Sequence, residues 1–215
     1  MVQNWVVQNW QAELTPPPVE SAGRVTFGSL CNIAKVNEGV IALWSRVLAG
    51  APTAGLLMAT IAPGAPRERL LEAFARHGVG RERIAFADWL EESRFVQLYA
   101  KVDVVLDVFP CNGATTTCEA LWQGVPVVTF RGEAFPGRAG ASLLGSAGMG
   151  EFVAADAGGY VDIATRLAGD PASLRRLRAT LRDRLAGSPV MDEAGFTLGL
   201  EAGYRRAWRE WCGRP

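Results

Sequence analysis

A glycine and three consecutive threonines precede a short predicted helix in the stretch PCNGATTTCEALWQGVPVV, residues 110–128. Gly113 has no side chain, so the backbone there can approach an anion closely. The hydroxyls of Thr115, Thr116 and Thr117 can donate hydrogen bonds beside the free N–H groups at the start of the helix. Those N–H groups also carry the positive end of the helix dipole. The stretch therefore has the chemistry of a diphosphate-binding site.

Glu119 lies one turn further into the same predicted helix. It would face away from the phosphates, and its carboxylate can accept hydrogen bonds from paired hydroxyls, as the acidic residue of a dinucleotide site does with ribose. The ligand that these residues indicate is a nucleotide sugar. A purely structural interpretation is that Asn112 or Thr115 caps the helix and Glu119 is a solvated helix residue. The residues alone leave both interpretations open.

The elements that must position this stretch follow from the pattern of apolar runs. Short apolar, β-rich runs alternate with segments of helical periodicity from Arg24 onward, which predicts a parallel sheet with helices on both faces, a Rossmann-like α/β fold. The stretch follows one strand and precedes another, so it lies at the carboxyl edge of the sheet, where such folds bind ligands. The expected strands are 24–29, 55–61, 83–87, 102–108, 126–130 and, more weakly, 151–154, and the expected helices between them are 37–49, 66–77, 91–100, 115–123 and 138–147.

Two terminal segments differ from this alternating pattern. Residues 1–23 contain QNW twice and then three prolines, which predicts an N-terminal tail and Pro-rich linker before a lobe over 24–215. Only helices are expected after the sheet, at about 159–168, 171–185 and 192–212. Aromatic residues are enriched at interfaces, so the tryptophans of the two ends, Trp5, Trp10, Trp208 and Trp211, predict either self-association or a tail that folds over the lobe. A purely structural alternative is that Trp208 and Trp211 cap the core of their own domain.

The composition excludes several classes of protein. The 215 residues include 22 basic and 22 acidic ones, so the balance of charge indicates neither a nucleic-acid partner nor a membrane partner. The sequence shows neither an apolar run of about 20 residues nor a signal peptide, and a cytoplasmic location is expected. No CxxC pair accompanies the single histidine, His77, so no metal site is expected.

Two longer runs carry a resemblance to a known family. They are DVVLDVFPCNGATTTCEALWQGVPVVTFRGEAFPGRAGASLL, residues 103–144, and FGSLCNIAKVNEGVIALWSRVLAGAP, residues 27–52. Together they resemble the C-terminal lobe of the family 41 glycosyltransferases, the O-linked N-acetylglucosamine transferase and SPINDLY group, over roughly residues 24–212. The paired motifs NGxTTT and ALWxGVPVV are much more specific than a lone glycine loop. The resemblance implies the second half of a GT-B fold, a UDP-sugar donor, inverting chemistry, and neither a cofactor nor an essential metal.

The resemblance also implies roles for individual residues at the diphosphate and the ribose. Lys35, in the sequence NIAK, matches the lysine that contacts the diphosphate and stabilises the leaving group, so it is the expected catalytic residue. Asn32 falls where a polar side chain lies near the nucleotide. Thr115 and Thr116 match hydroxyls at the diphosphate, and Glu119 matches the acidic residue that holds the uridine ribose, in agreement with the chemistry of the stretch.

Three further residues have a structural alternative beside the role that the resemblance implies. Trp89 and Leu90 fall where the family cradles uracil, although ordinary core packing would explain them as well. Arg138 matches a family arginine near the site, although an arginine at the start of a helix is often a surface or interdomain contact.

The chain also departs from the family pattern. Phe95 and Ala114 stand where many members have histidines, and no residue is expected to act as a general base. The N-terminal lobe and the tetratricopeptide repeats of the family have no counterpart in these 215 residues. The expected function is therefore a donor-binding lobe that needs an N-terminal lobe or a repeat-containing partner to act. The alternative is a noncatalytic nucleotide-binding or protein-interaction module derived from such a lobe.

Overall fold

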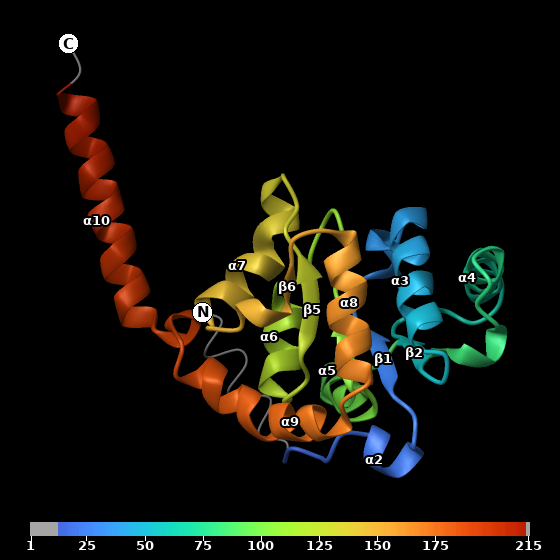
Figure 1. Cartoon of the computed structure of the whole chain (residues 1–215). Helices are drawn as coiled ribbons and strands as arrows, with labels where there is room; N and C mark the ends of the chain where they lie inside the picture. The colour runs from blue at the N-terminus through green and yellow to red at the C-terminus, as the bar shows by residue number, and fades with distance from the viewer. Residues whose placement is uncertain (1–12, 214–215) are drawn as a thin grey trace.

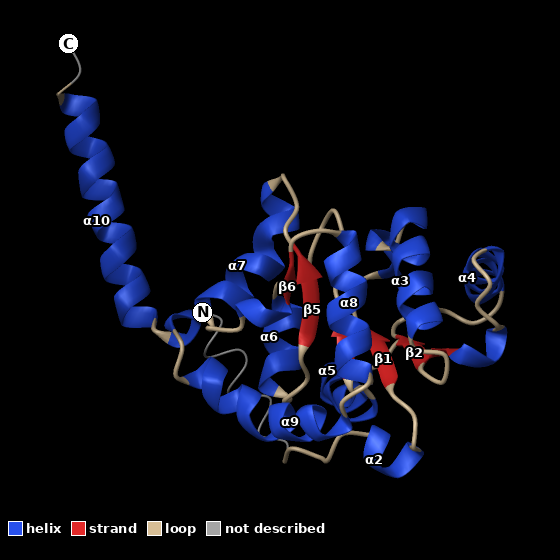
Figure 2. Cartoon of the chain, viewed as in Figure 1, coloured by secondary structure: helices blue, strands red, loops and turns tan. Residues whose placement is uncertain are grey.

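A six-stranded parallel sheet forms the centre of the chain, in the computed structural model that describes residues 13–213. Its strand order is β3-β2-β1-β4-β5-β6, the order of a doubly wound nucleotide-binding sheet (Figures 1 and 2). The predicted Rossmann-like fold is confirmed, and each expected strand is present in a shorter form. The strands are β1 (Thr26–Ser29), β2 (Gly55–Met58), β3 (Ile84–Phe86), β4 (Val104–Leu106), β5 (Val127–Phe130) and β6 (Val153–Ala154).

Helices lie on both sides of this sheet (Figure 1). One group contains α3, which packs against α4 and α8, and a second contains α6, which packs against α7 and α9. The central strands are buried on both faces, which explains why they read as continuous apolar runs in the sequence. The helices are α2 (Val19–Ala22), α3 (Glu38–Gly50), α4 (Ala65–Arg76), α5 (Glu92–Phe95), α6 (Thr115–Trp122), α7 (Ala139–Ser146), α8 (Ala157–Ala168), α9 (Pro171–Ala186) and α10 (Glu193–Cys212).

The single helix expected over 91–100 is wrong. The segment forms the short helix α5 and then a 3-10 helix, η3 (Val96–Lys101). Ten residues are too few for apolar spacing to distinguish 3.6 from 3.0 residues per turn, so the pattern could not separate the two. The tighter helix ends directly before β4.

The expected tail overlaps the packed lobe. Val19, in α2, is 8% exposed and belongs to the hydrophobic core. Its N–H donates to Asp103 Oδ1 at 3.0 Å, while the N–H of Thr26 donates to Asp103 Oδ2 at 2.8 Å. The core therefore extends into the segment that the sequence assigned to the tail. Trp5 and Trp10 lie outside the described residues.

Arg178 joins α9 to the rest of the lobe from a buried position. It is 4% exposed, and its guanidinium donates to the carbonyls of Tyr99 at 3.3 Å, Gln123 at 3.0 Å and Val102 at 2.6 Å. These carbonyls belong to η3, the end of α6 and the segment before β4. Burial lowers the pKa of Arg178 to about 10, so the group is still charged near neutral pH.

Asp107 joins several elements at the carboxyl edge of the sheet, as Arg178 does at the amino edge. Its carboxylate is buried and accepts hydrogen bonds from Gly113 N–H at 2.8 Å, Val108 N–H at 2.9 Å and the Thr129 hydroxyl at 2.8 Å. The Asp107 carbonyl accepts from the Tyr160 hydroxyl at 2.9 Å. One residue thus joins the loop before α6 to β5 and α8.

Replacement of Arg178 by methionine should strongly destabilise the lobe. Arg178→Met removes the guanidinium donor from three carbonyls, of which that of Tyr99 keeps the Val102 N–H at 3.3 Å. We expect the free energy of unfolding in urea to fall by about 3 kcal/mol. Arg175→Met on the same helix is the control, because Arg175 is 69% exposed and pairs with Glu20 at the surface. That pair should contribute less than about 1 kcal/mol. Similar losses for the two variants would contradict the role of Arg178.

Asp107 should make stability depend on pH in an unusual direction. Burial raises its pKa from 3.8 to about 6, so the folded state binds the proton more tightly than the unfolded state. The contribution of Asp107 to stability is therefore greatest below about pH 4 and is lost as the pH rises through about 6. We expect the unfolding free energy of the wild type, relative to Asp107→Asn, to fall by roughly 3 kcal/mol from about pH 4 to about pH 7. Parallel urea-denaturation results across this range would show that Asp107 does not titrate as described.

Candidate functional site

The candidate site lies where the strand order of the sheet reverses. β1 has β2 on one side and β4 on the other, so the connections after β1 and β4 leave the sheet side by side at its carboxyl edge. The first connection contains the 3-10 helix η1 (Ile33–Lys35), and the second leads into α6. Ligands of open α/β sheets bind at such switch points.

The first turn of α6 has no side-chain cap. Ala114 occupies the N-cap position, and its methyl side chain cannot accept a hydrogen bond from the helix. Neither Asn112 nor Thr115 is therefore the cap that the structural interpretation required. The side chain of Asn112 instead donates to the Val108 carbonyl at 2.8 Å. Thr115 is exposed and Thr116 is half-buried. The start of α6 therefore presents backbone N–H groups and two hydroxyls to the carboxyl edge.

Gly113 and Thr117 form hydrogen bonds that stabilise the loop before α6. The Gly113 N–H donates to Asp107, and the buried Thr117 hydroxyl donates to the Gly113 carbonyl at 3.1 Å. A Cβ atom on Gly113 would lie 2.6 Å from the Thr116 hydroxyl oxygen, so only glycine fits this close approach. The expectation of a free Thr117 hydroxyl is wrong, because that hydroxyl is turned inward.

Lys35 lies beside the start of α6. The ammonium group of this half-buried residue donates to the Asn112 carbonyl at 3.0 Å, two residues before the N-cap of the helix. The Asn32 side chain accepts from Ala34 N–H at 2.9 Å and thereby caps η1, which carries Lys35. Two residues that are 77 positions apart from each other, Lys35 and Asn112, are thus brought into contact at the switch point.

Glu119 is buried one turn into α6. It is 4% exposed, and its Oε2 accepts a hydrogen bond from the Tyr99 hydroxyl at 2.9 Å, so the interpretation of Glu119 as a solvated residue is wrong. Burial, and secondly the neighbouring Glu119, raise the pKa of Tyr99 well above its usual value, which keeps the hydroxyl protonated as a donor. Tyr99 is a site residue that the sequence did not reveal, because no local pattern connects η3 with α6.

Trp89, Leu90 and Arg138 belong to neither of the two elements at the switch point, η1 and α6. Trp89 follows β3 and is 74% exposed, so core packing does not explain it, whereas the half-buried Leu90 does pack against the core. Arg138 is exposed and lines a hollow of about 580 Å³ together with Ala114 and Arg131. No motif in the sequence indicated Arg131 as a site residue. The hollow places two guanidinium groups beside the start of α6.

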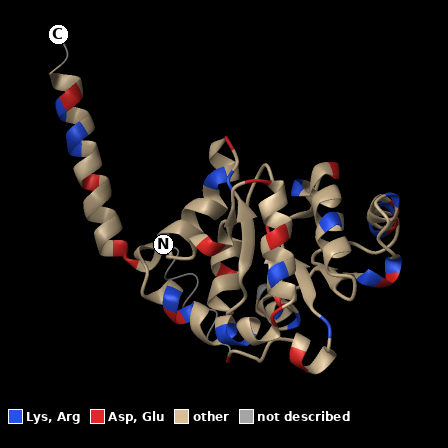
Figure 3. Cartoon of the chain, in the orientation of Figure 1, with Lys and Arg blue, Asp and Glu red and all other residues tan. Residues whose placement is uncertain are grey.

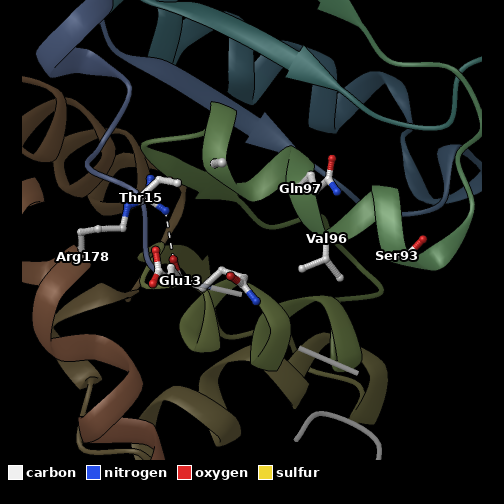
Figure 4. Close-up of a pocket in the computed structure, with 8 residues that line it drawn as sticks. Glu13, Thr15, Ser93, Val96, Gln97 and Arg178 are labelled. Carbon is white, nitrogen blue, oxygen red and sulfur yellow. Dashed lines mark hydrogen bonds between the residues drawn. The ribbon is translucent and has the colours of Figure 1, made fainter. Parts of the chain in front are cut away.

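A second hollow, of about 210 Å³, lies at the other end of α6 (Figure 4). Glu13, Thr15, Ser93 and Arg178 contribute to its lining, and none of the predicted site residues does. Gln123 also lines it, and its buried side-chain nitrogen has no hydrogen-bond partner in the described part of the chain. This hollow is separate from the switch point.

Residues 13–213 contain no group of three or more histidine, cysteine, aspartate or glutamate residues arranged to hold a metal ion. Among the same residues, no helix is long and apolar enough to cross a membrane.

Comparison with known proteins places this geometry in a family. The sequence model of Glycosyl transferase family 41 matches residues 20–200. The chain is 38% identical over 201 residues to the probable UDP-N-acetylglucosamine--peptide N-acetylglucosaminyltransferase SPINDLY of Arabidopsis thaliana, and the match covers 92% of this chain and 22% of that protein.

Solved structures agree with the sequence comparison. A mutant of the O-GlcNAc transferase from Thermobaculum terrenum superimposes with a TM-score of 0.82 at 37% identity, over 88% of this chain and 37% of that one. The C-terminal domain of the glycosyl transferase LpcC from Francisella tularensis shares the fold at 15% identity, with a TM-score of 0.61 over 86% of this chain and 97% of that domain. With a Rossmann-like lobe of GT-B type, an uncapped helix at its switch point and a family match over most of its length, this chain belongs to glycosyl transferase family 41.

Proposed function

We propose that this chain is the donor-binding lobe of a glycosyltransferase resembling O-linked N-acetylglucosamine transferase, and that it binds a UDP-sugar at the start of α6. The observation that carries the proposal is the uncapped first turn of α6 beside the ammonium group of Lys35. Free N–H groups, the helix dipole and a lysine together suit a diphosphate. The name of the Arabidopsis relative, which contains UDP-N-acetylglucosamine, supports the choice of donor.

Each part of the donor has a proposed contact at the switch point. The hydroxyls of Thr115 and Thr116 and the N–H groups of the first turn bind the diphosphate. The Glu119 carboxylate, which the Tyr99 hydroxyl orients by a hydrogen bond at 2.9 Å, is the proposed partner of the ribose hydroxyls. Trp89 is exposed after β3, and its apolar surface together with Leu90 suits a uracil ring.

Two further proposed contacts complete the site. The residues around Asn32 border the nucleotide, because the 3-10 helix that Asn32 caps carries Lys35. Arg138 contributes positive charge from the hollow beside Ala114.

The proposed reaction is a displacement at the anomeric carbon of the donor sugar. A hydroxyl or amide of the acceptor forms the new bond and releases its proton to solvent as the bond to the diphosphate breaks with inversion. UDP leaves with the bonding electrons. Lys35 and the start of α6 stabilise the negative charge that develops on the leaving diphosphate, without a metal ion. Fixed donors of this kind are each worth roughly 100- to 1000-fold in rate.

Acceptor binding belongs to parts beyond these 215 residues. The chain spans 22% of the length of the Arabidopsis relative. We propose that an N-terminal lobe, or a partner with tetratricopeptide repeats, supplies the acceptor site and the opposite wall of the cleft.

Lys35 should be required for binding of the diphosphate. In calorimetric titrations, Lys35→Met should weaken UDP binding about tenfold or more, because a charge-assisted hydrogen bond contributes about 1.5–3 kcal/mol. Lys101→Met is a matched control, since the exposed Lys101 precedes β4 at the opposite edge of the sheet. UDP should bind the wild type equally well in EDTA. Failure of the wild type to bind UDP, or equal losses for the two variants, would contradict the proposed site.

Glu119 should contribute to binding of the ribose and not of the phosphates. Glu119→Gln keeps an acceptor for the Tyr99 hydroxyl but removes the charge, so we expect UDP to bind about tenfold more weakly and inorganic pyrophosphate to bind as before. Tyr99→Phe should weaken UDP binding by a smaller factor, because it keeps the carboxylate and removes only the hydroxyl that bonds to Glu119 at 2.9 Å and to the Thr116 carbonyl at 3.2 Å. An equal loss for UDP and pyrophosphate would show that Glu119 supports the fold of α6 and does not contact the ribose.

A further inference from the structure

Arg67, on α4, joins two segments that leave the sheet at its carboxyl edge. Charged residues are frequent on α4 (Figure 3), and Arg67 is the one among them that is not exposed. Its Nε and Nη2 atoms donate to the Ile61 carbonyl at 3.0 and 2.8 Å, and Nη2 also donates to Asp88 Oδ1. Its guanidinium lies over the ring of Phe86, 5.4 Å from the centroid. One side chain thus connects the loop after β2 with the segment after β3.

The loop after β2 contains a strained residue. Thr60 has a φ of 60°, and among the residues that the structure describes it is the one non-glycine residue with a positive φ. A β-branched side chain crowds the backbone in this region, so the conformation persists only where other contacts impose it. The Ile61 N–H donates to the Ala87 carbonyl at 3.1 Å, and the Ile61 carbonyl accepts both hydrogen bonds from Arg67. These contacts fix the backbone directly after Thr60.

Both of these segments lie at the same edge of the sheet as the switch point. β2 and β3 are parallel to β1, so their carboxyl ends face in the same direction as that of β1. β3 lies two strands from β1, which is about 10 Å, and a nucleoside extends over such a distance from its diphosphate. The segment after β3 is therefore within reach of the base of a nucleotide whose diphosphate lies at the start of α6.

Trp89 depends on its neighbours in the chain for its position. Its side chain is 74% exposed, so packing does not hold it in place. On one side, Leu90 is half-buried and packs against the core. On the other side, Asp88 is paired with Arg67. The backbone of Trp89 is thus held between two anchored residues, and Arg67 provides one of the two anchors.

We propose that Arg67 is a positioning residue for the base of the nucleotide, because it holds Asp88 and so determines where Trp89 meets the base. The inference rests on the proposed function, in which a nucleotide binds at the switch point. The Arg67 guanidinium faces the Ile61 carbonyl, Asp88 and Phe86, so it acts through the segment that it holds. Arg67 therefore contributes to the affinity for the base and not to the affinity for the diphosphate.

Calorimetric titrations with UDP and with inorganic pyrophosphate separate these two contributions. Arg67→Met keeps an apolar stem over Phe86 but removes the donors, and it should weaken UDP binding about fivefold while pyrophosphate binding stays within about twofold of the wild type. Arg69→Met is the matched control, because Arg69 is exposed on the same helix, and it should change neither affinity. Equal losses for the two ligands, or no loss for UDP, would overturn the role of Arg67.

The wild type distinguishes failure of this inference from failure of the proposed function. A wild type that binds neither UDP nor pyrophosphate would contradict the donor site, and this inference with it. A wild type that binds UDP no more tightly than pyrophosphate would overturn the base contact alone.

A double-mutant cycle separates positioning of Trp89 from a general structural effect. In the Trp89→Ala protein, Arg67→Met should change UDP binding by less than about twofold, because the side chain that it positions is gone. Asp88→Ala breaks the same contact at an exposed position, where the fold does not depend on it, and should weaken UDP binding about threefold in the wild type only. Equal effects of Arg67→Met in the wild type and in the Trp89→Ala protein would show that Arg67 does not act through Trp89.

Discussion

The buried carboxylate of Asp107 is the contact on which the candidate site depends. It holds the Gly113 N–H and the Thr129 hydroxyl, so the loop before α6 cannot move independently of β5. Because that loop ends at Ala114, the position of the first turn of α6 follows from the same contact. The Asn112 carbonyl that accepts the hydrogen bond from Lys35 belongs to this loop as well. One desolvated acid thus determines where the free donors of the helix point.

The two edges of the sheet use polar groups differently. At the amino edge, Arg178 donates to three carbonyls and Asp103 accepts from two N–H groups, so both of these buried charged side chains have partners within the protein. At the carboxyl edge, the start of α6 has no such partner from a side chain. The contrast explains why the switch point, and not the smaller hollow near Arg178, is the surface suited to an anion.

The sequence by itself determined the sheet, the position of the NGATTT stretch at its carboxyl edge, and the family. Apolar runs and glycine and threonine signals are local, and two-sided burial makes the strands recognisable without any tertiary contact. Only the tertiary structure decided the pairings between distant residues: Lys35 with Asn112, Glu119 with Tyr99, and Arg178 with three carbonyls. No periodicity encodes a contact between residues that are far apart in sequence, because such a contact depends on how the elements pack.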